Sequence, residues 1–302
     1  MAETSTVAIV TQGARRDRDP RRAVTANRTD ALRLIGRLLL VGFLAGLAIV
    51  VIYPILWMVL SSFKTNGEIL QNPFGWPSAL NADSYGRALD SGVGTYLLNS
   101  VIVTAASVVS TTLLSAWAAY GLTRITIPFS RTILFVIVGG LMLAPTVAVI
   151  PLVRLLQSWG IYDSYWALIV LYTAFRIPFT TFLIRSYMVD LPVEVDEAAV
   201  LDGARNSQIF WRITLPMSAP IITSAVILQI LFAWNEYLFA LIFVGDDALK
   251  TLPVGLATLS SRSVTDFPAV FAGMTIAAVP MIVLFFVCQK YFIRGLADGI
   301  GK

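Results

Sequence analysis

Four stretches of this sequence run for more than 20 residues without a charged side chain. They are residues 38–63, 96–123, 132–153 and 267–289. Because an apolar run of about 18 residues or more can cross the hydrocarbon core of a bilayer as a helix, each stretch predicts a transmembrane helix. Two further runs, residues 165–184 and 215–244, contain one charge each, Arg176 and Glu236. The sequence therefore predicts six membrane-spanning helices.

The composition agrees with an all-α polytopic membrane protein. Charged residues make up 13% of the chain, about half the share of roughly 25% found in soluble domains. The chain has no histidine, and Cys288 is its single cysteine. Disulfides, metal sites built from His and Cys, and Cys/His or Ser/His catalysis are therefore excluded within this chain. The net charge of +4 gives no reason to expect nucleic-acid binding.

The basic residues predict which way the chain crosses the membrane. If the N-terminus is cytoplasmic, 16 of the 22 Lys and Arg residues lie on the cytoplasmic side and 5 lie outside. Such an excess is typical of cytoplasmic segments in bacterial inner-membrane proteins. Six spans then place both termini and residues 192–216 in the cytoplasm. Residues 1–33 have no apolar periodicity and predict a disordered basic tail, followed by a six-span domain over residues 34–302.

A polar segment, residues 192–216, interrupts the apolar part of the chain. Pro192 is suited to the first position of a helix. The acids at 194, 196 and 197 then fall in the first turn, where they favour the positive end of the helix dipole. Gly203 predicts a left-handed C-cap, and Ser207 predicts the N-cap of a second short helix. Pro216 then closes the unit and leads into the fifth span.

The same segment carries a long gapped motif. Glu-Ala-Ala at 197–199 is followed after three residues by a glycine and after nine more by Ile-x-Leu-Pro. This pattern resembles the EAA signature of permease subunits of ABC importers. The matching residues, with the acid that precedes the glycine, are Glu197, Ala198, Ala199, Asp202, Gly203, Ile213, Leu215 and Pro216. The stretches FAWNEYLFAL, TLPVGLATL and RGLADGIGK are similar to the smaller permease of maltose-type carbohydrate importers.

The resemblance implies a type I ABC importer permease fold and a set of partners. In that family the EAA loop is a coupling helix that docks on an ATPase subunit. The implied partners are a second permease, two ATPase subunits and an extracytoplasmic solute-binding protein. This chain has no G-x-x-x-x-G-K-[ST] phosphate loop. We therefore expect a transport subunit that is not itself an enzyme, and we expect the partner ATPase subunits to bind ATP and Mg²⁺. The cargo implied is a sugar or oligosaccharide, with a glycerophosphate or another polyol as the alternative.

Arg176 and Glu236 are ionisable residues predicted to lie inside the membrane, where such groups usually face a cavity or a partner. At 1.5 Å per residue, they lie about 16 Å and about 12 Å from the same side of the membrane. They are therefore expected to form an ion pair or to line one pathway, unless the span boundaries are misplaced. Trp234 and Asn235, beside Glu236, are candidates for sugar contact by stacking and hydrogen bonding.

Two rival functions follow from the same composition. An ion-coupled secondary transporter is expected to show an inverted repeat with discontinuous half-helices, and the sequence contains no convincing repeat. A membrane enzyme would need catalytic side chains within the spans. The absence of histidine and of clustered intramembrane carboxylates argues against it.

Overall fold

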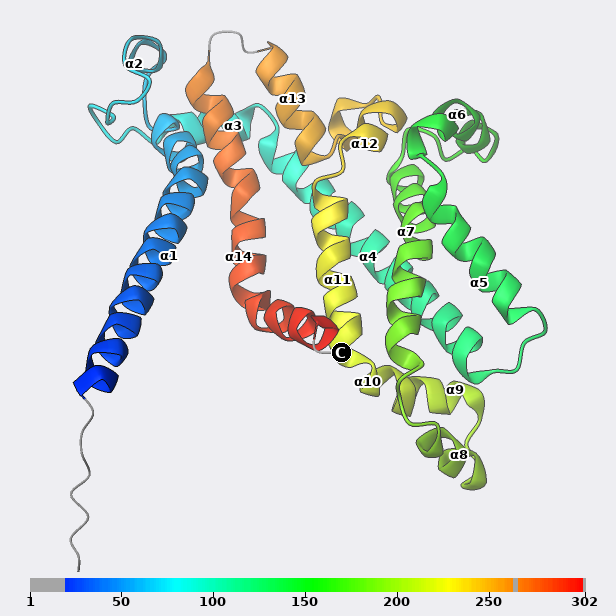
Figure 1. The fold of residues 1–302 in the computed structure, drawn as a ribbon. Coiled ribbons are helices and arrows are strands. Elements are labelled where there is room, and N and C mark those ends of the chain that lie inside the picture. Colours follow the sequence, from blue (N-terminus) through cyan, green and yellow to red (C-terminus); the bar gives the residue numbers. More distant parts are fainter. Residues whose placement is uncertain (1–19, 263–265, 301–302) are drawn as a thin grey trace, which may run out of the picture. The chain divides into compact units, whose positions relative to one another are not determined.

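A computed structural model describes residues 20–262 and 266–300, and the described residues are helical with no strands. They form two compact units, which divide between Trp57 and Met58. The first unit contains most of helix α1 (Pro20–Ser61), and the second contains the other helices (Figure 1).

Helix α1 begins at Pro20 and holds Pro54 inside it. Its part from Gly36 to Ser61 is long and apolar enough to cross a membrane. Residues 20–33 of the predicted tail have helical backbone and belong to α1. A helix that is already nucleated extends at little cost, and no breaker stands between Pro20 and the apolar span. Residues 1–19 of the predicted tail lie outside the described residues.

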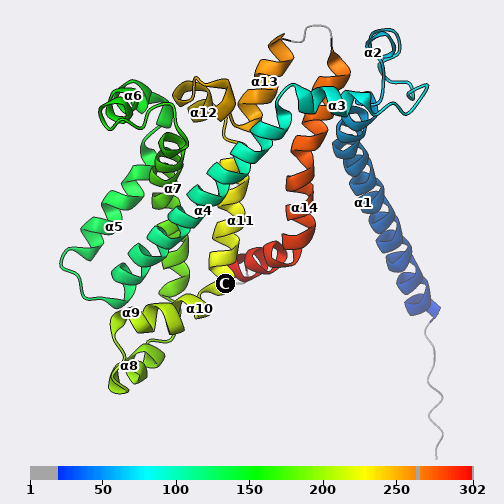
Figure 2. The same ribbon diagram turned by 180° about the vertical axis from the view of Figure 1, so that it is seen from behind.

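Three more helices are long and apolar enough to cross a membrane: α4 (Val93–Arg124), α7 (Tyr165–Met188) and α14 (Phe267–Ile300), the last over Phe267–Gln289. Both views show α4 running alongside α7 and α11 (Figures 1 and 2). The α4–α7 interface contains small and hydroxyl side chains. Ser110 Oγ lies 2.7 Å from Thr173 Oγ1, and Ser115 Oγ donates to the Ile177 carbonyl over 3.4 Å. Close approach of this kind holds helices together within a membrane.

The third predicted span is broken. Helix α5 (Ser130–Gly139) continues into the 3₁₀ turn η1 (Gly140–Met142), and a second arm contains η2 (Pro145–Ala148) and α6 (Val149–Ser158). The two arms meet at 88°. Pro145 explains the break, because proline pushes the residue before it out of the helical region, and Ala144 has extended angles of φ −70° and ψ 122°. The prediction of one continuous helix over residues 132–153 was wrong.

The fifth predicted span is shorter than expected. Helix α11 (Ala219–Trp234) has 16 residues and ends before Glu236, so it is about 24 Å long. A separate short helix, α12 (Leu238–Phe243), follows it. Glu236 therefore lies in the break between two helices rather than inside a span. With the two bent pairs counted as one span each, the described residues hold up to six spans.

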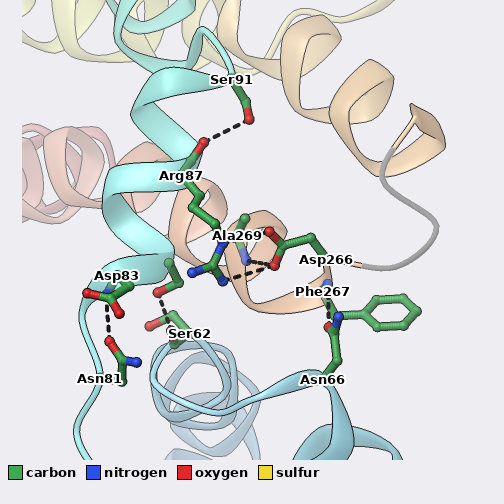
Figure 3. Close-up of polar contacts among 10 residues, drawn as sticks. Ser62, Asn66, Asn81, Asp83, Arg87, Ser91, Asp266, Phe267 and Ala269 are labelled. Atoms are coloured by element: carbon green, nitrogen blue, oxygen red, sulfur yellow. Dashed lines mark hydrogen bonds and ion pairs between the residues drawn. The ribbon is translucent and has the colours of Figure 1, made fainter.

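One end of the second unit is built from α2 (Asn66–Gln71), α3 (Asp83–Asp90), η4 (Asp247–Leu249) and α13 (Leu252–Arg262). Figure 3 shows how this end is fastened to α14: Arg87 Nε donates to Asp266 Oδ2 over 2.8 Å, and Arg87 Nη2 donates to Asp266 Oδ1 over 3.1 Å. Asp266 also accepts the Ala269 backbone N–H at the start of α14. The hydrogen bonds from Arg87 lower the pKa of Asp266.

The opposite end contains the EAA segment, defined here as residues 192–216. It consists of α8 (Glu194–Leu201), α9 (Asn206–Ile209), the π-helical turn η3 (Phe210–Thr214) and the start of α10 (Leu215–Met217). In Figures 1 and 2, α8 and α9 lie at one end of the bundle, whereas α6, α12 and α13 lie at the other.

Candidate functional site

The first helix of the EAA segment carries its acidic residues at its N-terminal end. Glu194, Asp196 and Glu197 occupy the first turn of α8, next to the positive end of the helix dipole. Pro192 lies just before the Val193 N-cap instead of at the first helical position. The predicted start was therefore two residues early, and the Val193 carbonyl accepts the first helical hydrogen bonds.

Gly203 ends this helix in the left-handed region, with φ +82°. A Cβ built on Gly203 meets no heavy atom within 4 Å. The requirement for glycine is thus set by the backbone angle, which costs an L-residue roughly 1 kcal/mol or more, and not by crowding.

The second helix differs from its prediction. The N-cap of α9 is Arg205, whose backbone N–H donates to Gln208 Oε1 over 2.8 Å, and Ser207 lies inside the first turn. Pro216 is itself helical, and the turn into α11 comes at Ser218, where the axes bend by 77°. A π-helical turn, which holds one residue more per turn than the α-helix, precedes this bend.

The motif residues divide between two faces. Ala199 is buried against Ala116, Ala119 and Ile209, and the half-buried Ile213 and Leu215 pack on the same cluster. The remaining motif residues, Glu197, Ala198, Asp202, Gly203 and Pro216, are exposed. One face of the segment is therefore fixed to the bundle, and the other is open to a partner.

Apolar side chains surround the exposed acids. Leu201 is 89% exposed, and Val200 and Val193 are about half exposed. With Glu197, they border a hollow of about 490 Å³. Exposed apolar groups that gather next to charged ones are typical of a surface for protein contact.

A cavity of about 340 Å³ lies between α4, α7, α11 and the broken third span. Its polar lining residues are Ser107, Thr111, Tyr172, Arg176, Gln229 and Glu236, and four phenylalanines, at positions 175, 179, 232 and 239, also line it. The volume lies within the range of small-molecule sites. The part of the chain that the structure describes has no cluster of three or more metal-binding side chains.

Arg176 and Glu236 both line this cavity and interact electrostatically, but no nitrogen–oxygen contact of ion-pair length joins them. The guanidinium carbon of Arg176 lies 3.8 Å from the centre of the Phe232 ring. Glu236 instead accepts hydrogen bonds from Tyr172 Oη over 2.8 Å and from the backbone N–H groups of Phe239 and Ala240 over 2.9 and 3.1 Å. The carboxylate thus holds the start of α12 against α7, and the arginine has its nitrogens available to the cavity.

Trp234 and Asn235 do not line the cavity. The Trp234 side chain is 7% exposed and packs in a cluster with Val93, Leu252 and Val270. Asn235 caps the end of α11, because its Nδ2 donates to the Leu231 carbonyl over 2.7 Å. In this structure neither residue lines the cavity, and their contact with a sugar stays a prediction.

Two contributions to the site escaped sequence reasoning. Gln229, which is 3% exposed, donates from Nε2 to Thr180 Oγ1 over 2.5 Å beside the cavity. Arg124 forms an ion pair with Asp196 of the EAA segment. A polar residue within an apolar run marks Gln229 as unusual, but nothing in the sequence relates Arg124 to an acid 72 positions away.

The sequence matches a known family over most of its described helical part. Residues 111–298 match the family described as "Binding-protein-dependent transport system inner membrane component". "Probable ABC transporter permease protein YurM" of Bacillus subtilis (strain 168) is 46% identical over 254 residues, which is 84% of this chain and 85% of that protein. The diacetylchitobiose uptake system permease protein NgcG of Streptomyces coelicolor is 35% identical over 83% of this chain and 84% of its own length.

A solved structure shares the fold. It is described as a bacterial ABC transporter involved in the import of the acidic polysaccharide alginate. It superposes with a TM-score of 0.77 at 23% identity, covering 88% of this chain and 98% of the other. The fold is therefore that of a type I ABC importer permease. With the family match and the relatives above, the chain belongs to the inner-membrane permease components of binding-protein-dependent ABC transport systems.

Proposed function

We propose that this chain is one of two permease subunits that form the translocation pathway of an ATP-driven importer for a sugar or oligosaccharide. A solute-binding protein delivers the cargo on the extracytoplasmic side. Two ATPase subunits bind ATP and Mg²⁺ and hydrolyse the nucleotide on the cytoplasmic side. The observation that best supports this proposal is the exposed face of the EAA segment, where Glu197 and Leu201 border the same hollow.

Docking of an ATPase on this face is supported by its chemistry. The face combines exposed acids with the exposed apolar side chains Val193, Val200 and Leu201. A protein partner that covers these groups removes their apolar area from water, which is favourable at roughly 25 cal/mol per Å². The opposite face packs on the bundle through Ala199, so movement of the docked helix is transmitted to the membrane-spanning helices.

The sugar class is supported by the relatives and by the cavity. Relatives at 30–35% identity are named as permeases for diacetylchitobiose, for trehalose and maltose, and for multiple sugars. The cavity offers the side chains that sugar recognition uses: hydroxyl and amide groups for hydrogen bonds, and phenylalanine rings for the apolar faces of a pyranose. Arg176 and Glu236 belong to the polar lining that this chain contributes to the pathway.

The orientation follows from the same proposal. The ATPases lie in the cytoplasm, so the EAA segment and both termini are cytoplasmic. The end of the bundle built from α3 and α13 then faces the solute-binding protein. This direction agrees with the excess of basic residues on the same side as the EAA segment.

The test is purification of the tagged chain together with the other subunits of its system. An ATPase subunit is expected to co-purify, and the solute-binding protein loaded with cargo is expected to stimulate ATP hydrolysis. Glu197→Lys should weaken both. Glu194→Lys, a matched change of an exposed acid in the same turn but outside the motif, should weaken them less. A purified chain without any ATPase subunit contradicts the proposal.

A further inference from the structure

A largely buried ion pair connects the EAA segment to α4. Arg124, the last residue of α4, places Nε 2.9 Å from Oδ2 of Asp196 in α8. The two side chains are only 7% and 14% exposed. Arg124 Nη2 also donates to the Leu191 carbonyl over 2.8 Å, and Thr214 Oγ1 donates to Asp196 Oδ1 over 3.3 Å. The pair therefore connects α4 to the residue just before the segment, to α8 and to the π-helical turn.

The neighbouring contacts come from the same face of α4. Tyr120, one helical turn before Arg124, donates from Oη to the Asn206 carbonyl over 3.2 Å. Its ring lies 5.3 Å from that of Phe210, centre to centre. Residues four apart share a helix face. Two side chains of α4, Tyr120 and Arg124, thus make polar contacts with the EAA segment.

The same helix leads to the cavity. Ser107, Val108 and Thr111 of α4 line it, and Thr111 lies 13 residues before Arg124, which is about 20 Å along the axis. Helix α4 is unbroken and contains no proline. Helix α7, the other long helix at the cavity, contains Pro178, which has no backbone N–H to donate, and α11 meets the EAA segment through a bend of 77°. Helix α4 thus connects the two sites as one helix without proline.

We infer that Arg124 and Asp196 are positioning residues that couple movement of the EAA segment to α4, and through α4 to the cavity. The inference rests on the proposed function, because it needs an ATPase to move the segment. An ion pair held in a poorly solvated place keeps its geometry, since separating the charges leaves each without compensation. Movement of α8 therefore carries the end of α4 with it instead of sliding past it.

The experiment follows one cysteine in the cavity. Val108→Cys, in the Cys288→Ser background, replaces a cavity-lining side chain on α4. In the complete complex in membrane vesicles, its modification rate by N-ethylmaleimide is measured without nucleotide and after trapping with Mg·ATP and vanadate. The ratio of the two rates is expected to differ clearly from unity. It is then measured with Asp196→Asn, with Arg124→Met/Asp196→Asn, with the exchange Arg124→Asp/Asp196→Arg, and with the exposed control Arg131→Met.

The double neutral change separates coupling from mere stability. It leaves no unpaired charge, so complex yield should recover relative to Asp196→Asn, while the rate ratio should stay near unity. The exchanged pair should restore part of the ratio, and Arg131→Met should keep all of it. Recovery of the ratio in the double neutral protein, or no nucleotide effect on Val108→Cys itself, overturns the inference. Absence of a co-purifying ATPase instead overturns the proposed function.

Discussion

Arg176 lies against the face of Phe232, with its guanidinium carbon 3.8 Å from the ring centre, and not against the carboxylate of Glu236. A cation over an aromatic ring gains about 0.5–2 kcal/mol, depending on how far it is desolvated. This contact compensates only part of the cost of a charge within the membrane. The arginine therefore keeps donors for a passing ligand, which is what a residue of the pathway needs.

The first prediction concerns the independence of these two residues. Because each charge has its own partner, the Phe232 ring for Arg176 and the Tyr172 hydroxyl for Glu236, the double variant should recover little of the complex yield that Glu236→Ala loses. Arg176→Ala should lower uptake while complex yield stays normal. The measurements are gel-filtration yield and cargo uptake for both single variants and the double. A double variant that assembles better than Glu236→Ala would show that the charges pair in the working complex.

The second prediction concerns Glu236 as a structural acceptor. Glu236→Ala leaves the Tyr172 hydroxyl and the backbone N–H groups of Phe239 and Ala240 without their acceptor. A buried group without its partner costs about 1–3 kcal/mol, so the variant should reduce complex yield and thermal stability. Tyr172→Phe removes only one of the three donors and should cost less. Equal stability of both variants would contradict this role.

The third prediction concerns the turn at Gly203. Gly203→Val forces a β-branched residue to φ +82° at a cost of roughly 1 kcal/mol or more, so α8 should shift and stimulated ATP hydrolysis should fall. Gly203→Asn is the matched control, because asparagine tolerates this region and the site has open space. Stimulated hydrolysis should therefore be higher with asparagine than with valine. The reverse order would mean that packing, not the backbone angle, requires glycine here.

The fourth prediction concerns orientation. In the Cys288→Ser background, Ser207→Cys on the EAA segment and Ala79→Cys near the opposite end both replace exposed side chains. A membrane-impermeant maleimide should label Ser207→Cys only from the cytoplasmic side and Ala79→Cys only from outside. Inside-out vesicles and intact cells distinguish the two. The opposite pattern would reverse the orientation derived from the basic residues.

The fifth prediction concerns acid sensitivity. Arg87 holds the pKa of Asp266 below its ordinary value of 3.8. Because the pKa is lowered in the folded state, the stabilisation is present above pH 3.8 and is lost as the pH falls through the lowered pKa. Asp266→Asn removes the charge interaction with Arg87 but keeps a side chain that can cap α14. Asp266→Ala also removes the cap, at a cost of about 0.5–2 kcal/mol.

The corresponding measurement is the midpoint of thermal unfolding of the purified complex. Asp266→Ala should lower it more than Asp266→Asn. The difference between wild type and Asp266→Asn should be small, because the pair is partly exposed, and it should disappear on acidification. A difference that grows as the pH falls would have the wrong sign for this carboxylate.

Much of the EAA segment could be predicted from sequence, because its features are local. The first-turn acids and the left-handed Gly203 follow from residue types at neighbouring positions. The start of α8 was two residues off because proline also favours the position just before a helix. Arg205, not Ser207, is the N-cap of α9, and its backbone N–H donates to Gln208 Oε1. A preference scale for single residues at the N-cap does not include this contribution from a residue three positions later.

The cavity could not be predicted in the same way. Helices α7 and α11 are apolar all round, so periodicity does not show which face a residue takes. Trp234 is the last residue of α11 and packs away from the cavity, whereas Glu236 follows the helix and lines the cavity. Pro145 indicated a disturbance of the third span, but a proline occurs in both kinked and interrupted helices, so the sequence did not show which of the two forms.

The interrupted third span also constrains how the chain is made. The α-helices of its two arms, α5 and α6, have ten residues each, so each helix is about 15 Å long, half of a hydrocarbon core of about 30 Å. The non-helical backbone between them is tolerated at membrane depth only where protein or cavity water covers it. Part of that cover is α7: Pro178 stands so near Gly140 that a Cβ there would lie 3.1 Å from the proline ring. Because α7 follows α5 and α6 in the chain, this part of the cover exists only after residues 130–188 have all been synthesised.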